Sequence, residues 1–433
     1  MRKKIVRLAT KPFVRNVLIM GGGSAAGQLI TILMSPVITR LYGPEAYGQM
    51  GIFISFCFLV IPAAALTYPV AIVLADDDAE ARGLAKISLR TSVGVALFVA
   101  AVLYLFSDEI MRVFQLEPIA SVVYLIPFVI LFSGYLQILE QWLIRQEQFL
   151  VTAKVEVLQA LALQGSRVGI GSFFPTSFVL IVSWSIGLAF KSALMHLFFH
   201  FPGNSRMSFV KEPGVSLSKI AKKYKDFPLF RTPQILLYSL SETLPLLLLA
   251  SFFGAAAAGF YSIGRTVLNV PVNLISKAVA DVFYQRFAMA AENKENLPAL
   301  IIKTSLALGA VGILPFGVIV LLGPQVFMWV FGAEWVTAGE YGRWLALWLF
   351  FVLLAKPATA ALPVLAAQRF HLGYTVFMIF VWVGGLSIGA YVFGSEEITV
   401  AIFGISGAVL NLLLVVLTLV ISQRFQESGI SKK

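Results

Sequence analysis

Twelve long apolar runs dominate this chain, and each is long enough to cross a lipid bilayer as a helix. A span needs about 20 mainly apolar residues to cross about 30 Å of hydrocarbon. Hydrophobic residues make up 59% of the 433 residues and charged residues only 13%, which is too few to cover a water-exposed surface. The sequence therefore predicts an all-α integral membrane protein with twelve transmembrane helices.

The predicted spans form two groups of six, separated by a long polar loop. The first six cover residues 17–39, 47–74, 87–106, 119–142, 155–174 and 178–197. The second six cover residues 235–253, 259–283, 304–322, 344–364, 373–393 and 400–421. We expect an N-terminal six-helix bundle over residues 1–200, a basic cytoplasmic linker over 201–234 and a C-terminal six-helix bundle over 235–433.

Lysine and arginine are concentrated in alternate loops, and this asymmetry predicts the orientation. With both termini in the cytoplasm, the inner segments hold 25 of the 33 basic residues and the outer segments hold 3. Cytoplasmic loops retain positive charge, so this orientation is strongly favoured. The net charge of +11 therefore indicates topology and contact with anionic lipid heads, and it does not indicate nucleic-acid binding. The other five basic residues lie within spans: Arg167, Lys191, Arg265, Lys277 and Lys356.

Two pairs of outer-loop segments are similar in sequence and indicate an internal repeat. "LYGPEAYGQ" from Leu41 matches "FFGAAAAGF" from Phe252 at two glycines and an alanine. "VFQLEPIASVVY" from Val113 matches "VFGAEWVTAGEY" from Val330 at Val, Phe, Glu and Tyr. Because six is even, the two halves enter and leave on the same side, so they are parallel repeats about an axis along the membrane normal. Such repeats predict a cavity between the two bundles near the midplane.

One predicted span carries polar groups at unbroken four-residue intervals, namely Arg265, Asn269, Asn273, Lys277 and Asp281. Each four-residue step turns an ideal helix by about 400°, so the row slants around the axis. The first three residues share a face, whereas the last two turn away unless Pro271 bends the helix. Lys277 and Asp281 are also spaced for a structural ion pair one turn apart.

Arg265 is predicted to lie near the middle of the bilayer, as deep as Glu242 in the preceding antiparallel helix. A central charge costs about 2.5 to 3.5 kcal/mol on insertion scales, which favours an interior face and a function. Two interpretations stay open. Arg265 either faces a cavity and binds substrate, or it pairs with Glu242 in a clamp between the two helices.

The other charged residues within the predicted spans also allow either a structural or a functional interpretation. Lys191 and Lys356 lie in the inward halves of their helices and can extend to the interface, and Arg167 lies toward an outer end. Five embedded cations outnumber the embedded acids, which favours an anionic ligand over a cationic drug. The embedded acids Glu242, Glu156 and Asp281 are candidates for coupling a proton or sodium ion. We expect no resident cofactor or metal, because Cys57 is the only cysteine and the three histidines are scattered.

Five segments carry a resemblance to a known family. They are "GPEAYGQMGIF", "YPVAIVLADDDAEA", "YKDFPLFRTPQILLYSLSETLPLLLLASFFG", "AGFYSIGRTVLNVPVNLISKAVADVFYQRF" and "FGAEWVTAGEY". In order and spacing they resemble the polysaccharide flippases of the MOP superfamily, particularly the Wzx-type O-antigen translocases. The resemblance covers essentially the whole chain.

This resemblance implies a V-shaped, MATE-like transporter of the bacterial inner membrane that works by alternating access. The implied substrate is an undecaprenyl-pyrophosphate-linked oligosaccharide, an O-antigen or exopolysaccharide repeat unit, moved to the periplasmic leaflet. In that family, cationic side chains in the cavity are thought to bind the pyrophosphate and the acidic sugars of the substrate. By position that role falls on Arg265, with Lys277, Lys191, Arg167 and Lys356 as weaker candidates. Polysaccharide polymerase and glycosyltransferases are the protein partners that the resemblance suggests.

Three alternatives stay open at this point. An ion-coupled exporter of MATE type would depend on Glu242, and a lipid II flippase would usually carry two further helices. A membrane scaffold would hold glycosyltransferases on the basic central loop, through Lys222, Lys223 and Lys225. An enzyme is disfavoured because no carboxylate pair, nucleophile and base, or metal cluster can be assembled.

Overall fold

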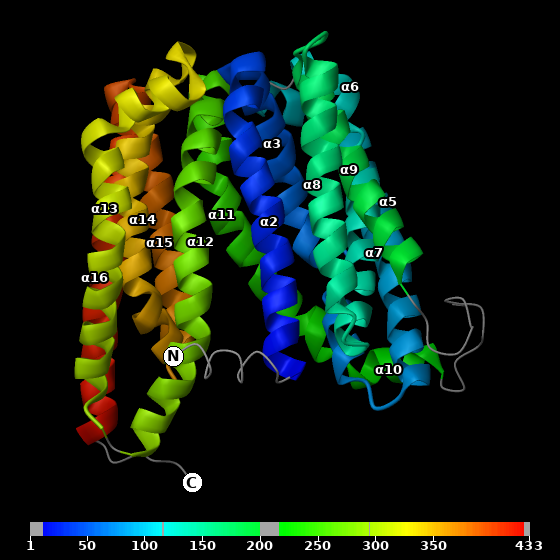
Figure 1. The fold of residues 1–433 in the computed structure, drawn as a ribbon, viewed down its shortest axis with the longest axis vertical. Coiled ribbons are helices and arrows are strands. Elements are labelled where there is room, and N and C mark those ends of the chain that lie inside the picture. Colours follow the sequence, from blue (N-terminus) through cyan, green and yellow to red (C-terminus); the bar gives the residue numbers. More distant parts are fainter. Residues whose placement is uncertain (1–11, 115–116, 200–215, 294, 428–433) are drawn as a thin grey trace. The chain divides into compact units, whose positions relative to one another are not determined.

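The computed structural model describes residues 12–114, 117–199, 216–293 and 295–427, which are helical almost throughout (Figure 1). The side chains of residues 12–20, 118, 274–282 and 285 lie outside the described part. Within the described residues the chain forms twelve helices of 17 residues or more. Each corresponds to one of the twelve predicted spans.

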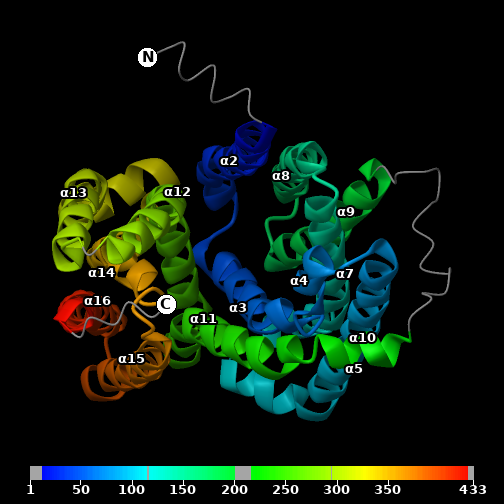
Figure 2. The ribbon, with the colours of Figure 1, turned by 90° about the horizontal axis from the view of Figure 1, so that it is seen from below.

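The chain divides into two compact units, Met1–Leu247 and Leu248–Lys433. The division falls after Leu247, inside helix α11 (Thr232–Phe253), whereas the sequence predicts that the C-terminal bundle begins at residue 235. The first unit contains six further long helices: α2 (Pro12–Leu41), α3 (Pro44–Val60), α5 (Asp78–Phe114), α7 (Ile126–Arg145), α8 (Phe149–Gly171) and α9 (Ser177–Phe198). Helix α8 packs against α2 and α9, and α7 packs against α5 and α9 (Figure 2).

Short helical segments connect the long helices of the first unit. They are η1 (Ile61–Ala63), α4 (Tyr68–Ala71), η2 (Ile72–Leu74), η3 (Glu117–Ile119), α6 (Ala120–Val123), α10 (Leu217–Lys223) and the π-helical η4 (Phe227–Arg231). The predicted second span, 47–74, is wrong as a single helix, because α3 ends at Val60. Pro62 and Pro69 lack the N–H that a continuous helix requires, and Leu66 and Thr67 adopt left-handed φ angles of 49° and 55°.

The second unit is formed by α12 (Ala255–Glu292), α13 (Leu297–Phe331), α14 (Val336–Ala361), α15 (Gln368–Ile388) and α16 (Glu396–Glu427), with the short η5 (Ala333–Trp335) and η6 (Gly389–Phe393). Helix α14 packs against α12, α13 and α16. Glycines permit these contacts, because a Cβ on Gly339 would lie 2.5 Å from the carbonyl oxygen of Gly323, and one on Gly404 would lie 2.5 Å from that of Trp344. Close backbone approach at small residues is typical of helix packing in membranes.

The local geometry repeats between the two halves of the chain. Helices α3 and α12 both begin directly after a matched glycine, Gly43 and Gly254. Helices α5 and α13 both end in Val-Phe, and each is followed by a 3₁₀ turn that contains a glutamate. Each also kinks shortly before its end, at Phe106 (φ −122°, ψ 18°) and Leu322 (φ −120°, ψ 17°). The internal repeat predicted from the sequence is therefore visible in the backbone.

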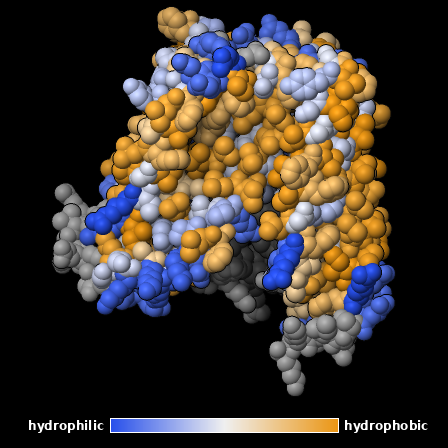
Figure 3. Space-filling model, turned by 180° about the vertical axis from the view of Figure 1, so that it is seen from behind, coloured by the Kyte–Doolittle hydropathy of each residue, from blue (hydrophilic) through white to orange (hydrophobic). Residues whose placement is uncertain are grey.

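Ten helical segments within the described residues are long and apolar enough to cross a membrane. Helix α8 is not among them, because charged and amide side chains, including Glu156 and Arg167, lower its hydropathy. The side chains of α12 are described only up to Asn273 and, apart from residue 285, from Phe283 onward, and Arg265 and Asn269 interrupt the first of these parts. Figure 3 shows apolar residues across the middle of the face drawn, with hydrophilic residues gathered near its upper and lower edges. This pattern is that of a multi-pass membrane protein.

Candidate functional site

Arg265 lies on α12 with its side chain half-buried among aromatic rings of the second unit. Its guanidinium carbon is 6.0 Å from the ring centroid of Tyr261 and 5.9 Å from that of Trp348. Tyr261 precedes Arg265 by one helical turn, and Trp348 comes from α14. Both distances fit cation–π attraction, which strengthens when the ring and cation are shielded from water. The rings therefore orient the guanidinium of Arg265 within the predicted span 259–283.

Of the two aromatic residues that contact Arg265, the sequence could have indicated only one. Tyr261 could have been found by its four-residue spacing from Arg265, which places the two on one helix face. Trp348 could not, because it is distant in sequence and only the packing of α14 against α12 brings it to Arg265. Trp348 itself packs against Trp382 and Phe403, with ring centroids 5.7 Å and 4.9 Å away.

The remaining polar stripe of α12 is only partly described. Asn269 is half-buried and Asn273 is exposed. Lys277 and Asp281 are in the helix, but their side chains lie outside the described residues. Glu242 is half-buried on α11 in the first unit, whereas Arg265 belongs to the second unit. The proposed clamp between these two residues stays a prediction.

Lys191 forms an ion-pair cluster with two acids inside the first unit. Its Nζ lies 2.8 Å from Glu156 Oε1 and 3.3 Å from Glu140 Oε1, so α7, α8 and α9 each contribute one member. With both acids ionised, the cluster carries a net charge of −1. The positive charge of Lys191 is therefore compensated, and an anion could reach it only if these ion pairs opened. Glu156, a predicted coupling acid, lies in the same cluster.

Arg167 is buried between α8 and the neighbouring helices, at 7% exposure. Its Nη2 lies 3.4 Å from Met50 Sδ, and its backbone carbonyl accepts a 2.8 Å hydrogen bond from the Tyr42 hydroxyl. Within the described residues its Nε makes no hydrogen bond. Lys356 is half-buried on α14. The structure thus brings no two of the five embedded cations into one described contact. Within the described residues, no group of three or more His, Cys, Asp or Glu side chains could hold a metal ion.

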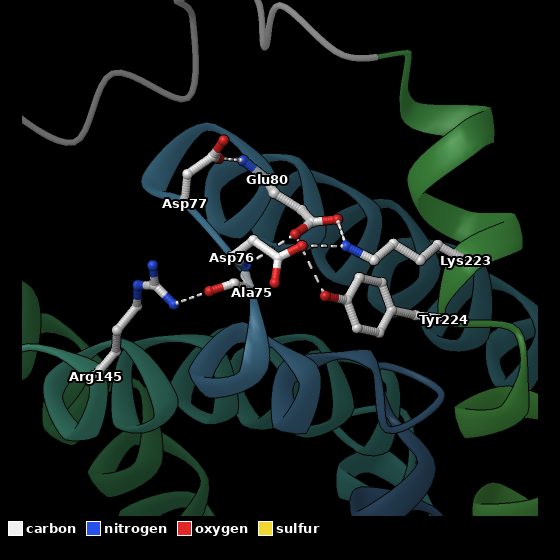
Figure 4. A network of polar contacts seen from close by, with 7 residues as sticks. All are labelled: Ala75, Asp76, Asp77, Glu80, Arg145, Lys223 and Tyr224. Carbon is white, nitrogen blue, oxygen red and sulfur yellow. Dashed lines mark hydrogen bonds and ion pairs between the residues drawn. The ribbon is translucent and has the colours of Figure 1, made fainter.

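The acidic segment that follows the second predicted span contacts the basic end of the predicted linker, residues 219–225 ("KIAKKYK"), in the first unit (Figure 4). Lys223, at the end of α10, donates hydrogen bonds to Asp76 Oδ2 at 2.8 Å and Glu80 Oε1 at 2.6 Å. The Tyr224 hydroxyl donates to Glu80 Oε2 at 3.4 Å. We call these four residues the latch. Acidic "ADDDAEA" and basic "KIAKKYK" carry complementary charge, which could have suggested the contact, although their separation in sequence gave no sign of it.

Further contacts fix the segment that carries the latch. Ile220 of α10 is 1% exposed, and a Cβ on Gly83 would lie 2.3 Å from its Cδ1. The Thr67 hydroxyl donates a 3.0 Å hydrogen bond to the carbonyl of Phe227. On the other side of the acidic segment, Arg145 donates to the carbonyl of Ala75 at 2.8 Å. Part of the predicted linker is therefore packed onto the first unit.

The latch shifts the protonation of its charged groups. The hydrogen bond from Lys223 lowers the pKa of Asp76 below its ordinary value. Hydrogen bonds to Asp76 and then Glu80 raise the pKa of Lys223. Both shifts favour the charged forms at neutral pH. Because Asp76 and Lys223 are exposed to water, the ion pair is screened by salt.

Comparison with known proteins places the chain in a family. Residues 37–340 match the family model described as polysaccharide biosynthesis protein. The chain belongs to this polysaccharide biosynthesis protein family. It is also 22% identical over 409 residues to the lipopolysaccharide biosynthesis protein WzxC of Escherichia coli (strain K12), covering 92% of this chain and 78% of WzxC. The family match and the similarity to WzxC bear out the resemblance to polysaccharide flippases that the sequence suggested.

Solved structures confirm the predicted MOP-type fold of this family member. A multidrug resistance MATE family transporter of the MOP superfamily, in its inward-facing conformation, matches with a TM-score of 0.74 at 14% identity. That match covers 93% of this chain and 96% of the transporter. The lipid II flippase MurJ, in an inward closed conformation, matches with a TM-score of 0.69 at 11% identity, over 94% of this chain and 90% of MurJ. At these identities the likeness shows the fold alone. This fold is found in transporters and flippases, and the predicted assignment as a transporter fits it.

Proposed function

We propose that this protein flips an undecaprenyl-pyrophosphate-linked oligosaccharide, an O-antigen or exopolysaccharide repeat unit, from the cytoplasmic to the periplasmic leaflet by alternating access. The family match supports a role in polysaccharide biosynthesis, and the MOP fold supports transport across the membrane. The proposal places the protein in the bacterial inner membrane with both termini in the cytoplasm. Its single most important support is Arg265, a cation held by aromatic rings within a spanning helix.

The chemistry of the substrate fits such a cation. A sugar head with a pyrophosphate cannot enter hydrocarbon unaided, because its hydroxyls and charges would lose their hydration. A guanidinium can donate two parallel hydrogen bonds to phosphate oxygens and so replace part of that hydration. Asn269 offers amide hydrogen bonds one turn further along α12. We assign weaker contacts to Lys277, Lys191, Arg167 and Lys356.

Energy for the movement has two proposed sources. An inside-negative membrane potential favours outward movement of negative charge, by about 2.3 kcal/mol per charge per 100 mV. A proton or sodium ion could be coupled in addition, at Glu242, Glu156 or Asp281. Glu156 is the candidate with described partners, because it shares Lys191 with Glu140. Loss of proton coupling at Glu156 should therefore change the pH dependence of transport more than its substrate preference.

The test is transport of defined lipid-linked sugars into liposomes that contain only the purified protein. Arg265→Ala should slow flipping about 10- to 100-fold, the loss expected for a charged hydrogen bond. Arg265→Lys should retain part of the rate, because it keeps the charge but loses the bidentate geometry. Arg369→Ala, which removes an exposed arginine elsewhere, is the matched control and should flip normally. Normal flipping by Arg265→Ala would exclude the proposed role of Arg265.

The MATE neighbour supports a second candidate, an ion-coupled exporter of small cations, and the net negative charge around Lys191 favours it. This function would depend on Glu242 and tolerate Arg265→Ala, so drug efflux and surface-glycan display in the two variants separate the candidates. The same liposomes loaded with lipid II test the function named for MurJ. A scaffold role would instead leave glycan display intact in Arg265→Ala and abolish it when Lys222, Lys223 and Lys225 are neutralised.

A further inference from the structure

The segment around α10 has two chemically different sides. Its apolar side is buried against the first unit through Ile220, which packs in a cluster with Leu84 and Ala81. Tyr224 and Phe227 lie partly buried against the same cluster. The latch fixes the orientation, because Lys223 is held by Asp76 and Glu80. The remaining basic side chains of the segment are therefore positioned by a rigid support.

The opposite side of the segment is basic and exposed. Lys219, Lys222 and Lys225 are all exposed, and within the described residues none of the three forms an ion pair. We call these three lysines the basic face. Two large exposed apolar side chains lie shortly beyond Asp226, Phe227 and Pro228, namely Leu229 at 60% and Phe230 at 71% exposure. Exposed apolar residues beside a row of lysines are the composition of segments that lie at a membrane surface.

The position of the basic face in the chain places it at the edge of the bilayer. A candidate span begins at Phe227, only two residues after Lys225. Lys219 precedes that point by two helical turns' length of chain, part helix and part turn, which at about 1.5 Å per residue is a separation on the order of 12 Å. The negative potential of the cytoplasmic leaflet acts over about one Debye length, roughly 8 Å at physiological salt. The three lysines are therefore within or near its range.

We propose that the basic face binds the phosphate groups of anionic phospholipids in the cytoplasmic leaflet, with Leu229 and Phe230 inserted beside them. The latch leaves these lysines available because Lys223 is the basic residue of the segment that pairs with Asp76 and Glu80 in the described contacts. Each basic residue near an anionic surface strengthens binding about fivefold, so three together contribute on the order of 100-fold. The proposal is independent of which substrate the protein carries.

Native mass spectrometry of the purified full chain in a mixture of phosphatidylglycerol and phosphatidylcholine tests this binding. The wild-type protein should retain phosphatidylglycerol in clear excess. The triple variant Lys219→Gln, Lys222→Gln, Lys225→Gln should lose at least tenfold of that preference, and the matching Lys→Arg triple should keep it. The charge-matched control Lys303→Gln, Arg369→Gln, Arg424→Gln also removes three exposed basic residues and should keep most of it. Equal losses in the site and control variants would overturn the proposal.

A second measurement needs no change of charge. Ser218→Cys carries a fluorophore beside the basic face, and nanodiscs contain headgroup-spin-labelled phosphatidylglycerol or phosphatidylcholine. Fluorescence should be quenched several-fold more by the anionic lipid, and high salt should reduce the difference. Equal quenching by both lipids would refute lipid binding. Retained lipid preference in the glutamine triple, together with loss of a bound glycosyltransferase, would assign the basic face to a protein partner instead.

Discussion

At the scale of single residues, the embedded charges of the first unit are not equivalent to free cations. Lys191 shares two carboxylates, and its side chain is 15% exposed while those of Glu140 and Glu156 are 34% and 27% exposed. The sequence showed that Lys191 and Glu156 are embedded, but their contact depends on how α8 and α9 pack. Composition alone counted Lys191 among the cations that could bind an anion, whereas the structure shows its charge compensated.

Lys191→Ala should therefore destabilise the protein, because it leaves two embedded carboxylates without their shared cation. We expect a loss of about 1–3 kcal/mol, less than for a fully buried pair since all three side chains are partly exposed. Denaturation of the purified protein in detergent measures the change. Lys154→Ala, at an exposed position on α8, should have little effect. Equal stability of the two variants would show that the cluster adds nothing to the fold.

At the scale of helices, close packing and surface ion pairs make different contributions. Helices α13 and α14 meet at Gly323 and Gly339, where backbone touches backbone. Their approach is fixed by the absence of two side chains. The latch instead joins α10 to the start of α5 through charges of which Asp76 and Lys223 are exposed, so it responds to solvent conditions.

Gly339→Ala should force α13 and α14 apart and cost about 1–3 kcal/mol, the usual effect of overpacking. Gly317→Ala is the matched control, because a Cβ at Gly317 would meet nothing within 4 Å. That control should be neutral or slightly stabilising, since alanine favours helix over glycine. The melting temperatures of the two variants, each compared with that of the wild-type protein, measure the difference. A fall in both, or in neither, would contradict the packing described for Gly339.

The latch should weaken in acid, and the sign follows from the lowered pKa of Asp76. Its contribution to stability is fully present above the ordinary pKa of aspartate and is lost as pH falls through the lowered folded value. The raised pKa of Lys223 adds a second limit, because its contribution is present below the ordinary lysine pKa and lost as pH rises through the folded value. Hydrogen exchange of residues 217–223 should be slower, after correction for intrinsic rates, at pH 7 than near pH 3. Lys223→Gln should abolish this difference, and a pH effect that persists in it would have another source.

At the scale of the whole molecule, the distribution of basic residues predicts which ends of the helices face the cytoplasm. Cys57 is buried, so an introduced exposed cysteine provides the reactive thiol. Thr176→Cys, between α8 and α9, should react with a membrane-impermeant maleimide in intact spheroplasts. Ser218→Cys, on α10, should react only after the membrane is permeabilised, because the positive-inside rule places this segment in the cytoplasm. Reaction of both in intact spheroplasts would contradict the predicted orientation.

Much of this protein was determined by its sequence alone, because the bilayer forces long apolar runs to satisfy their backbone hydrogen bonds as helices. The twelve helices, the internal repeat and the family all followed from local patterns such as those around Gly43 and Gly254. Only the tertiary structure decided which distant side chains meet. It placed Trp348 beside Arg265, joined Lys191 to Glu140 and Glu156, and docked Lys223 on Asp76 and Glu80. Such contacts depend on the packing and rotation of whole helices, which no short stretch of sequence specifies.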